Sequence, residues 1–232
     1  MRPYLKGGHA RRPSCVHAQP RAPATHALGR RLSMTFHAYQ HISVVADPTR
    51  TQPLTHDEQK DLSRDLNVLY MHTRGVLDNF AWSLLYERHP HIAPRVNPYD
   101  VGLFSQKYRA QCPCFVEIEK DIDVHRDWDK DLKERRDPVA HRIPLYIPPS
   151  FLSEQEGSAY HRLWDRYSKE IAELKVTEAG ATLEEMERIG RFIPHFLHDP
   201  FEPPIALYPT VPEDMANLIE IGDIVERALV RA

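Results

Sequence analysis

The sequence predicts an all-α fold, an antiparallel bundle of four to five main helices with long proline-rich connections. Apolar residues recur every three or four positions in several long segments, as they do on one face of a helix. A Ser/Thr-x-x-Glu capping box stands at the start of three such segments. The 20 prolines cluster between these segments, where they favour connections over helix interiors.

The longest predicted helix covers residues 55–88. It begins with a capping box formed by Thr55 and Glu58. Its apolar stripe consists of Leu62, Leu66, Leu69, Thr73, Leu77, Phe80 and Leu84. Arg74 and Asp78 flank the stripe with i, i+4 spacing, so they are able to pair. Residues 39–54, which precede this helix, are expected to be irregular, with one short strand at residues 41–45.

A long proline-rich connection, residues 89–115, leads to a second predicted helix over residues 116–136. Its stripe consists of Ile118, Ile122, His125, Trp128 and Leu132, and the same spacing continues to Arg136. Asp137 and Pro138 then have the form of an N-cap and the first position of a new helix. His141 would lie about one turn into that short element, and an extended proline-rich segment would follow it.

Three further helices complete the expected bundle. The first follows the capping box of Ser153 and Glu156, and its apolar face is expected to pack into the core rather than stack on bases. That face consists of Tyr160, Leu163, Trp164, Tyr167, Ile171 and Leu174. The capping box of Thr182 and Glu185 begins a shorter helix to about residue 196. The last helix begins at Pro212, after a proline-rich link.

Residues 1–38 are predicted to be a disordered basic arm or a non-native extension, and residues 39–232 a single helical domain. Residues 1–33 contain seven basic side chains and no acid, although the whole chain has a net charge of −3. Three interpretations of this segment stay open. It is an extension before a true start at Met34, an arm that contacts RNA or another polyanion, or a transit segment.

The cysteine count indicates a reducing location. Three cysteines do not make a disulfide framework, so we expect a cytoplasmic protein. No apolar run approaches the roughly 18 residues of a membrane span, and no membrane partner is expected. The sequence also contains no P-loop, no GxGxxG and no GxSxG motif, which leaves an NTPase, a Rossmann enzyme and a serine hydrolase unsupported.

The segment Arg136-Asp137-Pro138-Val139-Ala140-His141 resembles the Arg-(Asn/Asp)-x-x-x-His signature of the HEPN superfamily. These proteins are small α-helical bundles, and many of them are metal-independent ribonucleases, whereas others bind RNA or are purely structural. In the family the arginine ends one helix and the histidine begins the next. The segment that contains Asp78 resembles the first long helix of such bundles, where a polar or acidic residue faces the motif.

The resemblance implies a metal-independent endoribonuclease of the toxin or defence type, with Arg136, His141 and Asp78 as its catalytic residues. Histidine is suited to take the 2′-OH proton because its ordinary pKa is about 6.5. Arginine offers a planar fork of donors for the charge that builds on the phosphate. Asp78 would orient one of them. The implied partners are RNA, a second copy in a homodimer, and a cognate antitoxin or other protein. No cofactor and no metal are expected.

A non-catalytic interaction module of the same fold is the alternative, in which Arg136 and His141 hold a helix junction together. Two further motifs are weaker. Cys112 and Cys114 would ligate zinc if His89, His91 or His125 completed the site. His195-x-x-His198-Asp199 has the spacing of one helix face and resembles part of an HD phosphohydrolase site, which would also require acids such as Asp214 or Asp223.

Overall fold

The computed structural model describes residues 21–141, 143–198 and 201–230. Eight α-helices make up most of this part of the chain, so the predicted all-α class is confirmed. None of these helices has the length and apolar character needed to cross a membrane. The strands β1 (His195–Phe196) and β2 (Ile205–Ala206) form one antiparallel two-stranded sheet, in which His195 pairs with Ala206.

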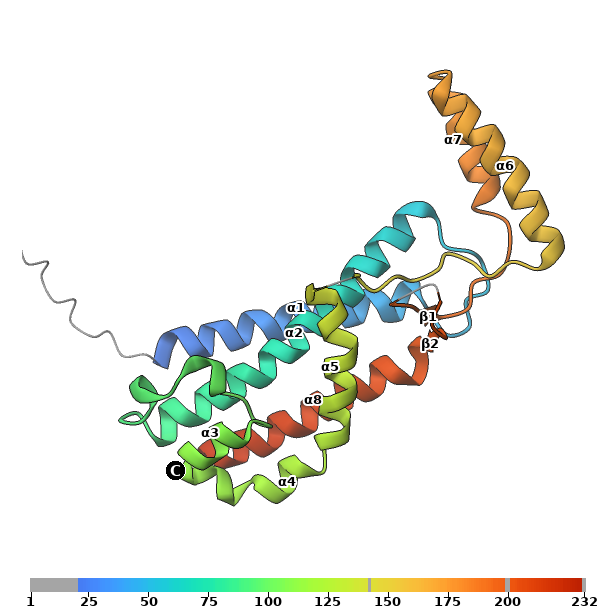
Figure 1. Ribbon diagram of the computed structural model, residues 1–232. Coiled ribbons are helices and arrows are strands. Elements are labelled where there is room, and N and C mark those ends of the chain that lie inside the picture. Colours follow the sequence, from blue (N-terminus) through green and yellow to red (C-terminus); the bar gives the residue numbers. More distant parts are fainter. Residues whose placement is uncertain (1–20, 142, 199–200, 231–232) are drawn as a thin grey trace, which may run out of the picture.

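Helices α1 (Arg21–Val45) and α2 (His56–Arg88) form a long antiparallel pair (Figure 1). The helix α1 corrects the expectation of disorder for residues 21–38, and of irregular structure with a strand at 41–45. Within α1 only three widely spaced side chains are buried among the described residues, namely Thr35, Ala38 and Ile42. So short a stripe gives a weak apolar signal in the sequence. Residues 1–20 of the predicted arm lie outside the described residues.

The start and the apolar face of α2 are as the sequence predicts. The backbone N–H of Glu58 donates to Thr55 Oγ1 (3.2 Å), and the Thr55 N–H donates to Glu58 Oε2 (2.8 Å). Every residue of the predicted stripe from Leu62 to Leu84 is buried. Both features agree with the prediction, because a capping box and an amphipathic face each depend on residues that are close together in the chain.

The connection after α2 contains short helices: η1 (Ala93–Arg95), η2 (Pro98–Asp100), α3 (Gln106–Gln111), η3 (Pro113–Glu117) and α4 (Glu119–Asp123). Helix α5 (Arg126–His141) follows. The predicted continuous helix 116–136 is therefore wrong, because the chain turns between α4 and α5. The apolar stripe is nonetheless inside the molecule: Ile118, Ile122 and Leu132 are buried, and His125 is 5% exposed.

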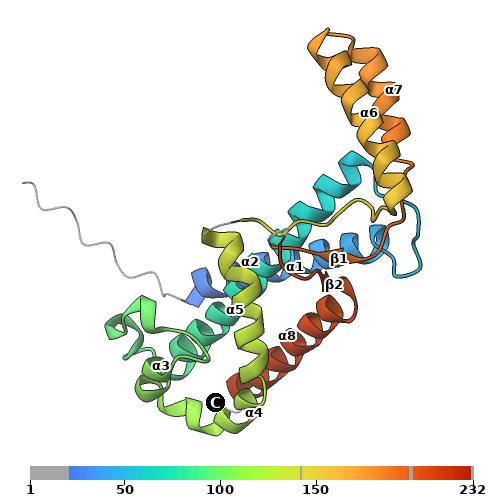
Figure 2. The ribbon, with the colours of Figure 1, turned by 45° about the vertical axis from the view of Figure 1, so that its right-hand side comes forward.

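Helices α6 (Glu154–Ala172) and α7 (Val176–Met186) form a hairpin that projects from the rest of the molecule (Figures 1 and 2). The capping box of Ser153 and Glu156 is present, but α6 contains no buried residue. The expectation that its aromatic face packs into the core is wrong. Trp164 is 50% exposed, because nothing in the described part of the chain covers the outer side of the hairpin.

The prediction that a capping box of Thr182 and Glu185 begins a helix is also wrong. Thr182 is buried inside α7, where its hydroxyl donates to Glu170 Oε2 (2.6 Å) and accepts from Arg166 Nε (2.9 Å). The threonine thus joins α7 to α6 instead of starting a helix. The last helix, α8 (Leu207–Val230), begins before the predicted Pro212, has a non-helical residue at Tyr208, and runs beside α2.

Candidate functional site

Arg136 and Asp78 lie near one another where α5 packs against α2. Asp78 is half-buried, and the positive charges of Arg74, Arg31 and Arg136 reach its carboxyl group. Burial raises the pKa of Asp78 and outweighs the three arginines, which lower it. Two of the three residues named from the HEPN resemblance, 58 positions apart in the chain, therefore share one site.

Asp129 of α5 is the second carboxylate of this site. It is 3% exposed and accepts hydrogen bonds from Arg74 Nη1 and from Lys133 Nζ (2.6 Å). Arg74 thus bonds Asp129 of another helix and not Asp78, its i, i+4 neighbour. We refer to Arg31, Arg74, Lys133 and Arg136 as the basic cluster.

The Arg136 guanidinium is partly free to meet a ligand. Its Nη1 donates to the adjacent Asp137 Oδ1 (3.1 Å), and the side chain is 30% exposed. Its Nε is buried and has no hydrogen-bond partner in the described part of the chain. A buried donor without a partner is costly, so this atom favours an acceptor that the protein itself does not provide.

Gly75 explains how Arg31 reaches the site. A Cβ atom at Gly75 would lie 1.9 Å from Arg31 Nη1, so the guanidinium occupies the space that any other residue would fill. Sequence reasoning missed Arg31 because it placed this residue in a disordered arm. The signal that points to it is a glycine in the middle of an otherwise regular helix.

His141 is the last residue of α5, and its side chain lies outside the described residues. The expected helix start at Asp137 and Pro138 is not observed, because α5 continues through both positions and ends within one turn of Pro138. Arg136 and His141 thus belong to one helix. Residues five positions apart on a helix lie roughly 140° apart around its axis. Positions 136 and 141 therefore lie on different sides of α5.

Next to this site, Arg135 belongs to a buried polar network. Its Nη2 donates to Asp214 Oδ1 (2.7 Å), and its guanidinium lies over the Tyr70 ring. Asp214 also accepts from Trp128 Nε1 (2.8 Å) and from the Tyr70 hydroxyl (2.9 Å). This network joins α8 to α2 and α5, and so holds the part of α5 that carries Arg136.

The two weaker motifs have different outcomes. His195 lies in β1, so the pattern that ends in His198 and Asp199 does not form the expected helix face, and Asp199 lies outside the described residues. Cys112 and Cys114, in contrast, lie beside His89 in the described structure. Their donor atoms are within 4.8 Å of one another, so these three residues could hold a metal ion.

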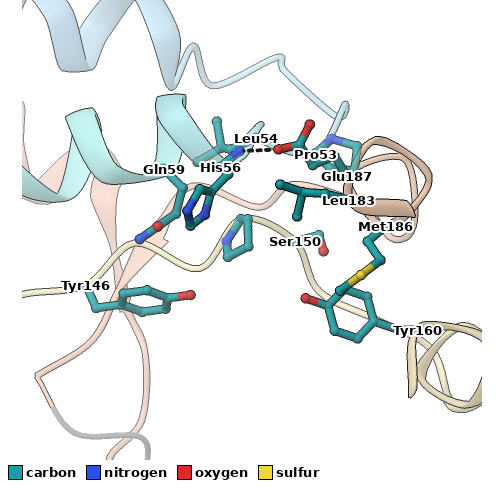
Figure 3. Close-up of a pocket in the computed structure, with 11 residues that line it drawn as sticks. Pro53, Leu54, His56, Gln59, Tyr146, Ser150, Tyr160, Leu183, Met186 and Glu187 are labelled. Carbon is teal, nitrogen blue, oxygen red and sulfur yellow. Dashed lines mark hydrogen bonds between the residues drawn. The ribbon is translucent and has the colours of Figure 1, made fainter. Parts of the chain in front are cut away.

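A pocket of about 330 Å³ lies between the base of the α6–α7 hairpin and the start of α2 (Figure 3). Tyr146 lines it from the segment between α5 and α6, Tyr160 from α6, and His56 from the first turn of α2. Glu187 Oε1 accepts a hydrogen bond from the His56 backbone N–H (2.6 Å). The carboxylate therefore binds a free donor at the helix N-terminus and links the hairpin to α2.

No family model, no curated protein and no solved structure matches this chain.

Proposed function

We propose that the protein is a metal-independent endoribonuclease of the HEPN type, and that the basic cluster binds the phosphodiester backbone of RNA. The observation that supports this is the proximity of Arg136 to the half-buried Asp78, together with the partnerless Nε of Arg136. Arg31 and Arg74 add positive charge at the same place. Arginine donors clustered around a phosphate give charge-assisted hydrogen bonds, which are the strong ones.

In the proposed mechanism, His141 takes the proton from the ribose 2′-OH, and the resulting alkoxide attacks the adjacent phosphorus. Arg136 stabilises the negative charge that builds on the phosphate oxygens. Asp78 orients the Arg136 guanidinium through its carboxylate. The P–O5′ bond breaks and the leaving 5′ oxygen takes a proton from solvent, so the products carry a 2′,3′-cyclic phosphate and a 5′-hydroxyl group.

The mechanism needs Arg136 and His141 in one site, although both belong to one continuous helix, and a homodimer would meet this need. Positions 136 and 141 are roughly 140° apart around the axis of one helix, so we propose that each site combines Arg136 of one subunit with His141 of the other. The dimer and any antitoxin-like protein partner are part of the proposal.

The cleavage test uses the full chain with mixed RNA in the presence of EDTA. Arg136→Ala and His141→Ala should each lower the cleavage rate by at least about 100-fold. His161→Ala and Arg162→Ala are matched controls, because both side chains are exposed on α6. Equal rates for wild type and both site variants, with intact folding, would exclude the nuclease.

A mixing experiment tests the shared site. When Arg136→Ala and His141→Ala proteins are unfolded together and refolded in equal amounts, half of the dimers are mixed, and each contains one intact composite site. Roughly a quarter of the wild-type activity should return. No recovery would place both groups in one subunit.

The second candidate function is a non-catalytic interaction module. The observation that favours it is the uninterrupted α5, which departs from the helix end and helix start that the HEPN motif implies. In this case Arg136→Ala and His141→Ala would lower the thermal stability, and the wild type would cleave no RNA. The same two variants thus separate the two functions.

A further inference from the structure

The end of α2 and the loop after α3 bring together three side chains of the kind that bind zinc. His89 is the C-cap residue of α2, and Cys112 is the C-cap residue of α3, while Cys114 lies in η3. Their ligand atoms all lie within 4.8 Å of one another, and the two sulfur atoms are 3.2 Å apart. We propose that His89, Cys112 and Cys114 bind one Zn²⁺ ion and that this ion ties the 89–118 connection to the end of α2.

The Nε2 atom of His89 faces the two cysteines. The backbone N–H of Cys114 donates to His89 Nε2 (3.1 Å), so this nitrogen carries no proton and the neutral ring has its proton on Nδ1. A metal ligand requires an unprotonated ring nitrogen, and the zinc ion would take this lone pair in place of the Cys114 N–H.

The sulfur atoms are inside the protein and close to the distance that zinc needs. Cys112 is fully buried and Cys114 is 8% exposed. Zn–S bonds of about 2.3 Å at a tetrahedral angle separate two sulfurs by roughly 3.8 Å. The present distance of 3.2 Å is well above the roughly 2.05 Å of a disulfide bond, and it needs to widen by only about half an ångström.

Zinc fits this donor set better than a hard cation does. Thiolate sulfur and imidazole nitrogen are ligands of zinc, whereas Mg²⁺ and Ca²⁺ take oxygen ligands. Two thiolates and a neutral imidazole balance the two positive charges of Zn²⁺, so the filled site is neutral and compatible with burial. Binding displaces the thiol protons into solvent. The fourth ligand would be water or His91, whose ring lies edge-on to that of His89.

This site is independent of the proposed ribonuclease. It lies at the end of α2, whereas Asp78 and Arg74 lie earlier in the same helix, and the rest of the basic cluster belongs to α1 and α5. Its function is structural. The 89–118 connection contains only short helical segments, and a cross-link at Cys112 and Cys114 restricts that chain in the folded state.

The test uses the full chain, purified under reducing conditions, stripped with a chelator and then loaded with Zn²⁺ or Co²⁺ alone. We expect one zinc ion per chain after dialysis, and a thiolate-to-cobalt charge-transfer band with Co²⁺. Zinc should also slow alkylation of Cys112 and Cys114, by roughly 100-fold at a free concentration 100 times the Kd. Cys15 serves as the internal control and should react at the same rate with and without zinc.

Variants provide the second arm. Cys112→Ser, Cys114→Ser and His89→Gln should each lose the cobalt band and the zinc-dependent rise in Tm, whereas Cys15→Ser should retain both. The wild-type alkylation experiment needs no variant, so a folding defect in one of them does not affect it. Failure of the wild type to retain zinc, equal zinc retention by Cys112→Ser, or a Cys112–Cys114 disulfide in the reduced preparation would each overturn the proposal.

Discussion

Asp214 offers the most direct test of how the helices are held together. The residue is 2% exposed, and its carboxylate accepts hydrogen bonds from Tyr70 of α2 and from Trp128 and Arg135 of α5. Asp214→Ala would leave the Arg135 charge, whose side chain is 13% exposed, without its partner inside the protein. Two neutral donors would lose their acceptor at the same time.

The magnitude follows from these contacts. Removing one partner of a buried ion pair costs about 3–5 kcal/mol, because the other charge stays buried and unpaired. For a chain of this size that corresponds to a decrease in Tm of roughly 6–20 °C. The assay is urea unfolding at pH 7, followed by far-UV circular dichroism. Asp165→Ala, which removes an exposed carboxylate from α6, is the control and should change stability by less than about 0.5 kcal/mol.

A double-mutant cycle shows whether the loss comes from the ion pair. When Arg135→Met is added to Asp214→Ala, the unpaired charge disappears, so the double variant should be more stable than the sum of the single effects by about 0.5–3 kcal/mol. The reasoning is refuted if Asp214→Ala behaves like Asp165→Ala, or if the two effects at the network add without coupling.

Three further predictions concern single residues of the site and the hairpin. Gly180→Ala, with open space around it, should raise the free energy of unfolding by about 0.5–1 kcal/mol. Gly75→Ala should raise it by less, because the new Cβ must also displace the Arg31 guanidinium at the end of a flexible side chain; chemical denaturation of both variants checks this order. Burial raises the pKa of Asp78, so the folded state holds this proton more tightly than the unfolded chain does. The contribution of Asp78 to the free energy of unfolding is therefore complete below about pH 4, and it is lost as the pH rises through the raised pKa of this residue. Asp78→Asn should accordingly gain stability relative to wild type between pH 4 and pH 7 in thermal melts, and a constant difference would contradict this. Glu187→Ala should lower stability by about 0.5–2 kcal/mol because it removes the acceptor for the first turn of α2; an unchanged melting curve would show that this contact contributes little.

The parts of the fold that were predicted correctly depend on short stretches of chain. The capping boxes of Thr55 and Ser153 each use residues three positions apart, and the stripe of α2 needs only a constant helical period. The Thr182 box has the same residue pattern but lies inside a helix, because contacts to α6 compete for its hydroxyl. A local pattern is thus informative until a tertiary contact uses the same group.

The candidate site was predicted in part, and for a similar reason. The short motif indicated Arg136, and the resemblance of the long helix to the first helix of such bundles indicated Asp78. Neither pattern indicated that Arg31 would approach through the gap at Gly75, because the sequence of α1 has only a faint apolar stripe. The break before α5 and the passage of that helix through Pro138 also depend on packing, which a period of three or four residues does not describe.

The sequence by itself determined the all-α class, the starts of α2 and α6, and which residues form their apolar stripes, since these follow from interactions within one or two helical turns. Only the tertiary structure decided which stripes are buried. It buried the face of α2 and left that of α6 only partly covered, because burial depends on what packs against a helix and not on the helix alone. It also decided that the charge of Arg136 acts on Asp78 and that His89 lies beside Cys112 and Cys114, because residues so distant in sequence come together only when whole segments pack.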